Sequence, residues 1–160
     1  MYFLFPTISF ASSIVIDTLD DGTVLAKFQT TYEPKRIIAL LNDPQKMSKI
    51  DGELEVSILQ IFDNCKDVQY TIPNFFMNIT YTARACLDQN RIELTLLESD
   101  DLSEFASYWD IQPIETGSEI TYSIRSIPKF PLPLFIIRQQ TQVGVEAFFE
   151  RFLSYIDTHK

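Results

Sequence analysis

The sequence predicts an α+β fold, in which a curved antiparallel sheet of about seven strands is covered by a long C-terminal helix. Three observations predict this fold. Most of the chain consists of short runs in which apolar and polar residues alternate, as they do in strands with one dry face. The connectors between the runs are short and rich in turn-forming residues, so consecutive runs are expected to pair as antiparallel strands. After the last run, apolar residues recur at helical spacing over residues 134–158.

A hairpin and two short helices are expected in the first third of the chain. Asp21-Gly22 lies between two alternating runs, and Asp-Gly at such a place is a strong hairpin signal. Pro34 is well placed to begin a helix, because proline fits the first helical turn, and Pro44 follows the end of that helix. The expected elements are strands over residues 8–16 and 24–32, and helices over about 34–41 and 45–50.

Six further runs form the rest of the expected sheet. In the third expected strand after the helices, Tyr81, Ala83 and Ala85 share the dry face, whereas Arg84 points to the wet face. The acidic stretch 98–104 is expected to be a solvated loop. The last two runs form a hairpin whose apolar face must be covered, and the closing helix is the element available to cover it. The runs are about 54–62, 67–72, 75–87, 91–97, 105–114 and 119–127.

Composition and charge limit the class of protein. The 160 residues are most simply one domain, 1–160. A composition of 46% hydrophobic and 22% charged residues is typical of a globular protein. The net charge of −9, from 22 acidic and 13 basic side chains, disfavours binding to nucleic acid or to anionic membranes. No segment approaches the length of a transmembrane span. Thirteen phenylalanines and seven tyrosines suit either a cavity for an apolar ligand or a core rich in aromatic residues.

Residues 1–22 and the two cysteines bear on the compartment. The first 22 residues hold either an extra strand or the remnant of a signal segment, and the strand is preferred because a basic n-region is lacking. Cys65 and Cys86 match no metal motif, so two free thiols are expected, with one disulfide as the alternative in an exported protein. The cytoplasm is favoured, and the periplasm or secretion is the alternative if the true start lies upstream of Met1.

Few residues suggest catalysis. His159, the sole histidine, is penultimate, and the chain has no Gly-rich phosphate loop and no Cys-x-x-Cys pair. We therefore expect no catalytic residue, no metal site and no cofactor. Arg138 is a candidate contact for a ligand head group, or else a solvated side chain. Tyr81 and Tyr122 are either donors or weak acids in a cavity, or ordinary core residues.

Several motifs, in their order and spacing, resemble one superfamily. They are Tyr32-Glu33-Pro34, Leu41-Asn42-Asp43-Pro44, Phe105-x-x-x-Trp109-Asp-Ile-Gln-Pro113, Gly117-Ser-Glu-Ile-Thr-Tyr122 and Ile127-Pro-Lys-Phe-Pro-Leu-Pro133. Together they resemble the helix-grip architecture of the START-like superfamily, also called SRPBCC, over residues 23–157. The resemblance is greatest to its polyketide cyclase/dehydrase and coenzyme-Q-binding branch. It implies a curved antiparallel sheet that grips the last helix around a hydrophobic cavity.

The function expected from this resemblance is binding or transport of a hydrophobic small molecule, such as a lipid, an isoprenoid quinone or a polyketide-like compound. Two alternatives stay open: an aromatase/cyclase-type enzyme that acts on a polyketide, and a protein-interaction module that uses the wet sheet face or the acidic loop. Fold alone does not choose among them. The residues expected at the ligand are Phe28, Ile79, Tyr81, Leu94, Trp109, Tyr122, Arg138, Phe148, Phe149 and Phe152.

Overall fold

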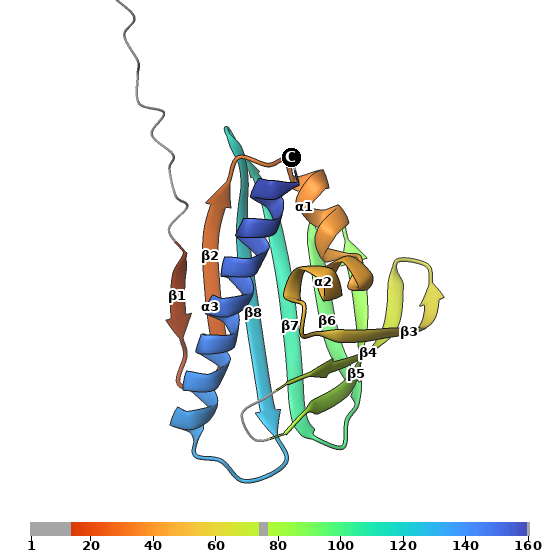
Figure 1. Ribbon diagram of the computed structural model, residues 1–160, viewed down its shortest axis with the longest axis vertical. Helices are drawn as coiled ribbons and strands as arrows, with labels where there is room; N and C mark the ends of the chain where they lie inside the picture. The colour runs from red at the N-terminus through yellow and green to blue at the C-terminus, as the bar shows by residue number, and fades with distance from the viewer. Residues whose placement is uncertain (1–13, 74–76, 160) are drawn as a thin grey trace, which may run out of the picture.

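A computed structural model describes residues 14–73 and 77–159, and these residues form one antiparallel sheet with three helices (Figure 1). The eight strands have the order β1-β2-β8-β7-β6-β5-β4-β3. This confirms the predicted α+β architecture, with one strand more than the seven expected. The elements are β1 (Val15–Thr18), β2 (Val24–Thr30), α1 (Pro34–Leu41), α2 (Pro44–Asp51), β3 (Glu55–Phe62), β4 (Cys65–Ile72), β5 (Ile79–Asp88), β6 (Arg91–Glu98), β7 (Leu102–Ile114), β8 (Gly117–Pro128) and α3 (Leu134–Thr158).

Local sequence explains where the helices begin and end. Pro34 begins α1. The Asp43 side chain caps α2 by accepting hydrogen bonds from the backbone N–H groups of Gln45 and Lys46, and Gly52 ends the helix in a left-handed conformation. Among the described helices, none has the length and apolar character that a membrane span requires.

The N-terminal strand is shorter than expected in the described part of the chain. β1 pairs with β2 only through residues 15–18, and most of the expected 8–16 strand lies outside the described residues. The prediction that residues 98–104 form a solvated loop is partly wrong, because β7 already begins at Leu102. Its Asp101 carboxylate accepts a hydrogen bond from the Thr80 backbone N–H at 2.8 Å, so this acidic residue orders the chain beside β5.

The two cysteines form a disulfide, which corrects the expectation of free thiols. Cys65 begins β4 and lies opposite Cys86 of β5 in the strand register, with 4.1 Å between their Cα atoms. The expected strand began two residues later, at residue 67, and so left Cys65 out of the ladder. Sequence spacing could not show the pairing, because it depends on the register of two strands.

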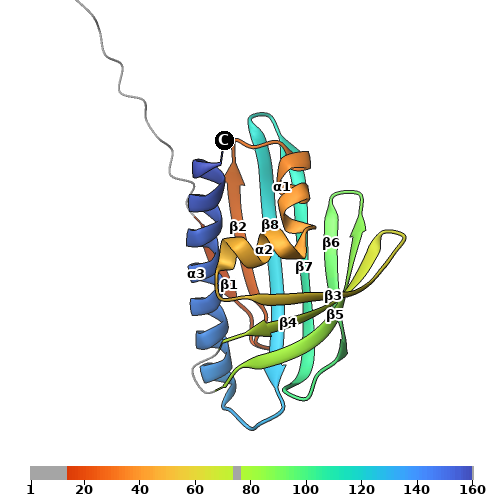
Figure 2. The ribbon, with the colours of Figure 1, turned by 45° about the vertical axis from the view of Figure 1, so that its right-hand side comes forward.

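The sheet bends strongly, and α3 covers only part of it. In Figure 2, β3, β4 and β5 run across the direction of β2 and β8. Helix α3 packs against β1, β2 and β8 and against α2. One buried cluster joins all three helices to β2, β6, β7 and β8. In the described residues, a second cluster consists only of strand residues from β4, β5 and β7, among them Tyr70, Tyr81 and Phe105.

Removal of the disulfide is expected to lower the stability of the sheet. The bond joins residues 21 apart in sequence, and closing a loop of that length stabilises a protein by about 3 kcal/mol. The double variant Cys65→Ala/Cys86→Ala should therefore lose about that much free energy of unfolding in urea titrations. Reduced wild-type protein is the matched control and should behave like the variant. An unchanged urea midpoint after reduction would contradict the prediction.

Two glycines are expected to respond to alanine in opposite directions. Gly117 has φ +148°, and an added Cβ would collide with the backbone of Thr30, so Gly117→Ala should destabilise the protein by roughly 2 kcal/mol or more. Gly144 lies inside α3, and a Cβ there would meet nothing within 4 Å. Gly144→Ala should therefore raise the free energy of unfolding by about 0.5–1 kcal/mol, as helix propensity predicts. Thermal unfolding followed by circular dichroism compares the two, and a loss of stability in Gly144→Ala would refute the second expectation.

Candidate functional site

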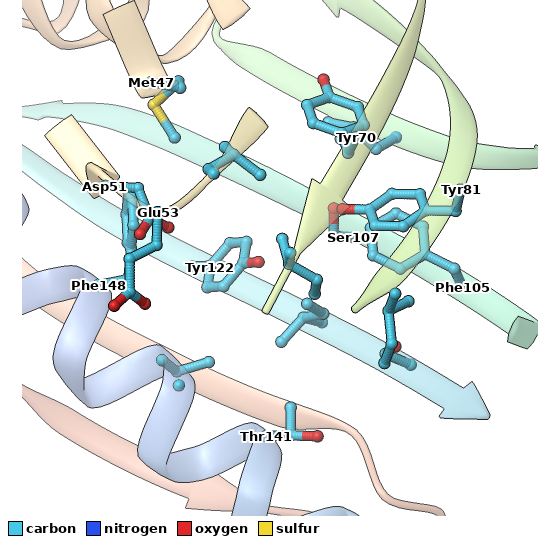
Figure 3. A pocket seen from close by; sticks show the side chains of 18 of the residues that line it. Met47, Asp51, Glu53, Tyr70, Tyr81, Phe105, Ser107, Tyr122, Thr141 and Phe148 are labelled. Carbon is cyan, nitrogen blue, oxygen red and sulfur yellow. The ribbon is translucent and has the colours of Figure 1, made fainter. Parts of the chain in front are cut away.

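A cavity of about 550 Å³ lies between α3, α2 and the bent sheet (Figure 3). It occupies the region where the second cluster faces α3 without contacting it. Small side chains on both sides leave this space open. Gly144 and Ala147 of α3 and Ala85 of β5 line the cavity, whereas the large rings of Phe149 and Phe152 lie on another side of α3 and are fully buried.

Six of the expected ligand contacts lie on the cavity wall: Ile79, Tyr81, Leu94, Trp109, Tyr122 and Phe148. Their role in binding stays a prediction. The other three aromatic residues, Phe28, Phe149 and Phe152, do not line the cavity. They pack together in the first cluster, with the rings of Phe28 and Phe149 4.9 Å apart in T-shaped contact.

Arg138 also lies away from the cavity. Its guanidinium is 3.9 Å from the Asp20 carboxylate, in the turn between β1 and β2. The preceding residue, Ile137, does line the cavity. Successive residues on a helix are rotated by about 100°, so Arg138 points past the cavity toward β1. Helical spacing from Leu134 placed Arg138 near the apolar stripe but could not tell which side of that stripe faces the cavity.

Two aromatic groups form opposite parts of the wall. On β7 and β8, Trp109 stacks on Tyr122 with 4.1 Å between ring centroids, and Phe148 of α3 meets Trp109 edge-on at 5.8 Å. On β5, the Tyr81 ring contacts Phe105 at 4.4 Å and stacks on Tyr70 at 5.3 Å. These contacts fix the rings and therefore fix the direction of their hydroxyl groups.

The hydroxyl groups of Tyr81 and Tyr122 point toward each other from opposite sides of the cavity (Figure 3). Burial raises the pKa of both phenols well above the usual value of 10.0, and it raises the pKa of Tyr70 to about 12. All three therefore stay protonated at neutral pH and can donate hydrogen bonds. They cannot serve as bases near neutral pH.

One end of the cavity is charged. Asp51 of α2 accepts a hydrogen bond from Arg151 of α3 at 2.9 Å, and this ion pair joins the two helices. Burial raises the pKa of the Asp51 carboxyl, and the nearby Arg151 guanidinium opposes that rise. Lys66 of β4 donates to the backbone carbonyl of Asn42 at 2.6 Å. Within the described residues, no cluster of histidine, cysteine and acidic side chains could hold a metal ion.

Sequence reasoning missed several wall residues, among them Tyr70, Phe105, Ser107, Asp51 and Arg151. A signal for two of them was present. Phe105 and Ser107 alternate in phase with Trp109 along β7, so they face the same side of the sheet. Asp51 gave no such signal, because it stands directly before the glycine that ends α2 and there resembles an ordinary helix end.

Comparison with known proteins identifies the fold. No family model and no curated protein matches the chain. Solved structures do match, among them a START superfamily protein from Mycobacterium smegmatis, with a TM-score of 0.78 and 11% identity over 86% of this chain and 99% of that one. The aromatase/cyclase ZhuI from Streptomyces sp. R1128 has a TM-score of 0.65 and 16% identity over 89% and 90% of the two chains. A protein from Thermus thermophilus has a TM-score of 0.73 and 15% identity over 83% of this chain and 98% of that one.

The chain has the START-like, helix-grip fold. This confirms the resemblance drawn from the sequence motifs. At these identities the likeness shows the START-like fold alone, since one fold hosts many functions. The assignment to a coenzyme-Q-binding branch stays a prediction.

The buried tyrosines predict how the stability of this protein depends on pH. Their pKa values are raised in the folded state, so the unfolded chain loses its phenolic protons first, near pH 10. Stability is expected to be fully present below pH 10 and to fall above it, by about 1.4 kcal/mol per pH unit for each such tyrosine. Urea unfolding measured between pH 8 and 11.5 checks this expectation.

Tyr81→Phe separates ionisation from packing. The variant has no phenol at this position, so its stability should fall less steeply above pH 10 than that of the wild type. Phe105→Leu, the control, disturbs the same cluster without removing an ionisable group, and it should lower stability equally at all pH values. Equal slopes in Tyr81→Phe and wild type would contradict the account.

Proposed function

We propose that the protein binds a hydrophobic small molecule in the cavity between α3 and the sheet. The observation that supports this best is the cavity itself. Its volume of about 550 Å³ falls within the range of roughly 300–1,000 Å³ that small-molecule sites occupy. Its walls are predominantly aliphatic and aromatic, with a few polar groups among them. Such a composition is typical of sites in which apolar burial supplies affinity and the polar groups fix orientation.

The mouth of the cavity supports the same proposal. Val143 and Gly144 of α3 both line the cavity, and both are exposed to solvent. Gly144 has no side chain to obstruct this route, and an added Cβ would meet no neighbour. A ligand can therefore enter beside α3 without displacing the buried cluster that holds the helix on β2 and β8.

A cyclase-type enzyme is a second candidate, because one of the similar solved structures is an aromatase/cyclase. The described side chains favour simple binding. General acid and base catalysis works best when the pKa of the group lies near the working pH, and burial moves the phenols of Tyr81 and Tyr122 away from it. Arg138, the other expected proton-transfer group, lies beside Asp20 instead.

A variant that fills the cavity tests the proposal. Ala85 lies on the cavity wall in β5, and Ala85→Phe should occupy part of the space and weaken binding of Nile red by at least about tenfold. Nile red is an uncharged dye that fluoresces more strongly in apolar surroundings. Ala106→Phe places the same side chain at an exposed position of β7 and should bind the dye as the wild type does.

Organic extraction of the purified protein, followed by mass spectrometry, provides the second measurement. We expect the wild type and Ala106→Phe to carry the same apolar molecule, and Ala85→Phe to lack it. The proposal fails if wild-type protein neither yields an apolar molecule nor binds Nile red. It also fails if Ala85→Phe, folded as judged by circular dichroism, binds the dye as tightly as Ala106→Phe.

A further inference from the structure

Two arginines of α3 carry a buried hydrogen-bond donor that the protein does not use. The Nε atoms of Arg138 and Arg151 are both buried, and among the described residues neither has a hydrogen-bond partner. Native structures rarely leave a buried donor without a partner, because the group has lost its water and gained nothing in return. The two arginines differ in one respect, since Arg151 lines the cavity whereas Arg138 lies beside Asp20. The unused donor of Arg151 therefore points to a partner in the cavity.

Arg151 stands at one end of the helix face that lines the cavity. The wall residues of α3 include five that recur every three or four positions and so share one face: Ile137, Thr141, Gly144, Phe148 and Arg151. A helix rises about 1.5 Å per residue, so this face is about 21 Å long between Ile137 and Arg151. Around Ile137 the wall includes the apolar side chains of Leu102 and Leu132. The cavity is therefore long, with a charged end at Arg151.

An acceptor stands beside the unused donor. Asp51 of α2 accepts a hydrogen bond from Nη2 of Arg151 at 2.9 Å. An ionised carboxylate offers about four acceptor positions, and Arg151 and the backbone N–H of Glu53 use only part of them. Figure 3 shows Asp51 and Glu53 at the end of the cavity that is remote from Tyr81. A donor and an acceptor thus lie together at this end.

The charges at this end are balanced. Among the described wall residues, the acidic ones are Asp51 and Glu53 and the basic ones are Lys66 and Arg151. A charged ligand group would add an uncompensated charge in partly buried surroundings, and desolvation of a charge costs far more than desolvation of a neutral polar group. Burial already raises the pKa of the Asp51 carboxyl, so these surroundings disfavour negative charge. The charged end of the cavity therefore favours an uncharged polar group.

We propose that Arg151 determines the orientation and specificity of binding by selecting an uncharged hydroxyl group at one end of an elongated apolar molecule. The hydroxyl oxygen accepts a hydrogen bond from Nε of Arg151, and the hydroxyl group donates its own hydrogen to the Asp51 carboxylate. A hydroxyl group can do both through one atom, whereas a carbonyl or ether oxygen can only accept. The apolar remainder lies along α3 toward Ile137. This inference rests on the proposed function, since it requires that the cavity binds an apolar molecule.

Three probes of similar shape test the inference. 4-Ethylbiphenyl ends in a methyl group, 4-biphenylmethanol has a hydroxyl group in place of that methyl group, and biphenyl-4-carboxylate ends in an anion. Each probe competes with Nile red, and the loss of dye fluorescence gives its dissociation constant. The hydroxyl preference is the dissociation constant of 4-ethylbiphenyl divided by that of 4-biphenylmethanol. Comparison of this ratio between variants cancels the difference in how water solvates the two probes.

Removal of the Arg151 donor should reduce the hydroxyl preference. A hydrogen bond to a charged group is worth at least about tenfold in affinity, so Arg151→Met should lower the preference by about that factor. Its affinity for 4-ethylbiphenyl should change by less than about threefold. Arg138→Met is the matched control, because Arg138 also has a buried Nε without a partner and lies beside an aspartate, but does not line the cavity. This control should keep the wild-type preference.

Arg151→Lys separates the Nε donor from the positive charge. Lysine keeps a cation for Asp51 but has no N–H group at the Nε position, so it should also lower the hydroxyl preference. This milder change also keeps the test decisive if Arg151→Met does not fold, as judged by circular dichroism. A wild-type preference in Arg151→Lys would overturn the assignment of the hydroxyl contact to Nε.

Biphenyl-4-carboxylate tests the charge of the selected group. The wild type should bind it at least about tenfold more weakly than 4-biphenylmethanol, and Asp51→Asn should narrow this difference by at least about threefold, because the competing negative charge is gone. Tighter binding of the carboxylate than of the alcohol by the wild type would overturn the claim that the selected group is uncharged.

The same measurements separate this inference from the proposed function. If Arg151→Met and Arg138→Met show equal hydroxyl preferences while Nile red still binds to both, the inference is overturned and the proposed function stands. If the wild type binds neither Nile red nor any of the biphenyl probes, the proposed function fails together with the inference.

Discussion

The structure depends on where α3 rests on the sheet. The rings of Phe149 and Phe152 hold the helix on one side of the bend, in the cluster that includes β2 and β8. Burial of such aromatic side chains is the main force that fixes the helix there. Because the sheet bends and the helix is straight, the two cannot touch along their whole length. The strands β4 and β5 are left facing the helix across open space, and their apolar residues form a cluster of their own.

The division of side chains by size follows from this arrangement. Where α3 contacts the sheet, its side chains are large, as at Phe152, and where it faces the cavity the small residues Gly144 and Ala147 stand beside the large side chain of Phe148. The opposite wall repeats the pattern, with Ala85 among larger residues of β5. A core of this kind is not loosely packed, since the first cluster is tight and ring contacts order the walls. The cavity therefore results from small residues at a few positions, such as Gly144, Ala147 and Ala85.

Most of the fold could be predicted from alternation, turn residues and the helical period. The expected helix over residues 134–158 matches α3, and six of ten expected contacts reach the cavity wall. The wrong predictions share one cause. The sequence pattern shows which face of a helix or strand a residue lies on, but it does not show which element packs against that face. Phe149 was correctly placed on the buried side of α3, but only packing shows that this side meets β2 rather than the cavity. The Cys65–Cys86 pair required the register of two strands, which the periodicity of each strand does not contain.

The disulfide has a consequence for the empty state of the protein. It joins β4 to β5, the two strands of the wall that α3 does not support. The disulfide restricts the relative movement of β4 and β5, so this wall of the cavity can keep its shape without a bound ligand. For the proposed ligand, a wall that is already rigid loses less conformational entropy on binding, so the disulfide would favour affinity without contacting the ligand. Disulfides persist in oxidising surroundings, and the rigidity of this wall is therefore tied to the redox state of the compartment.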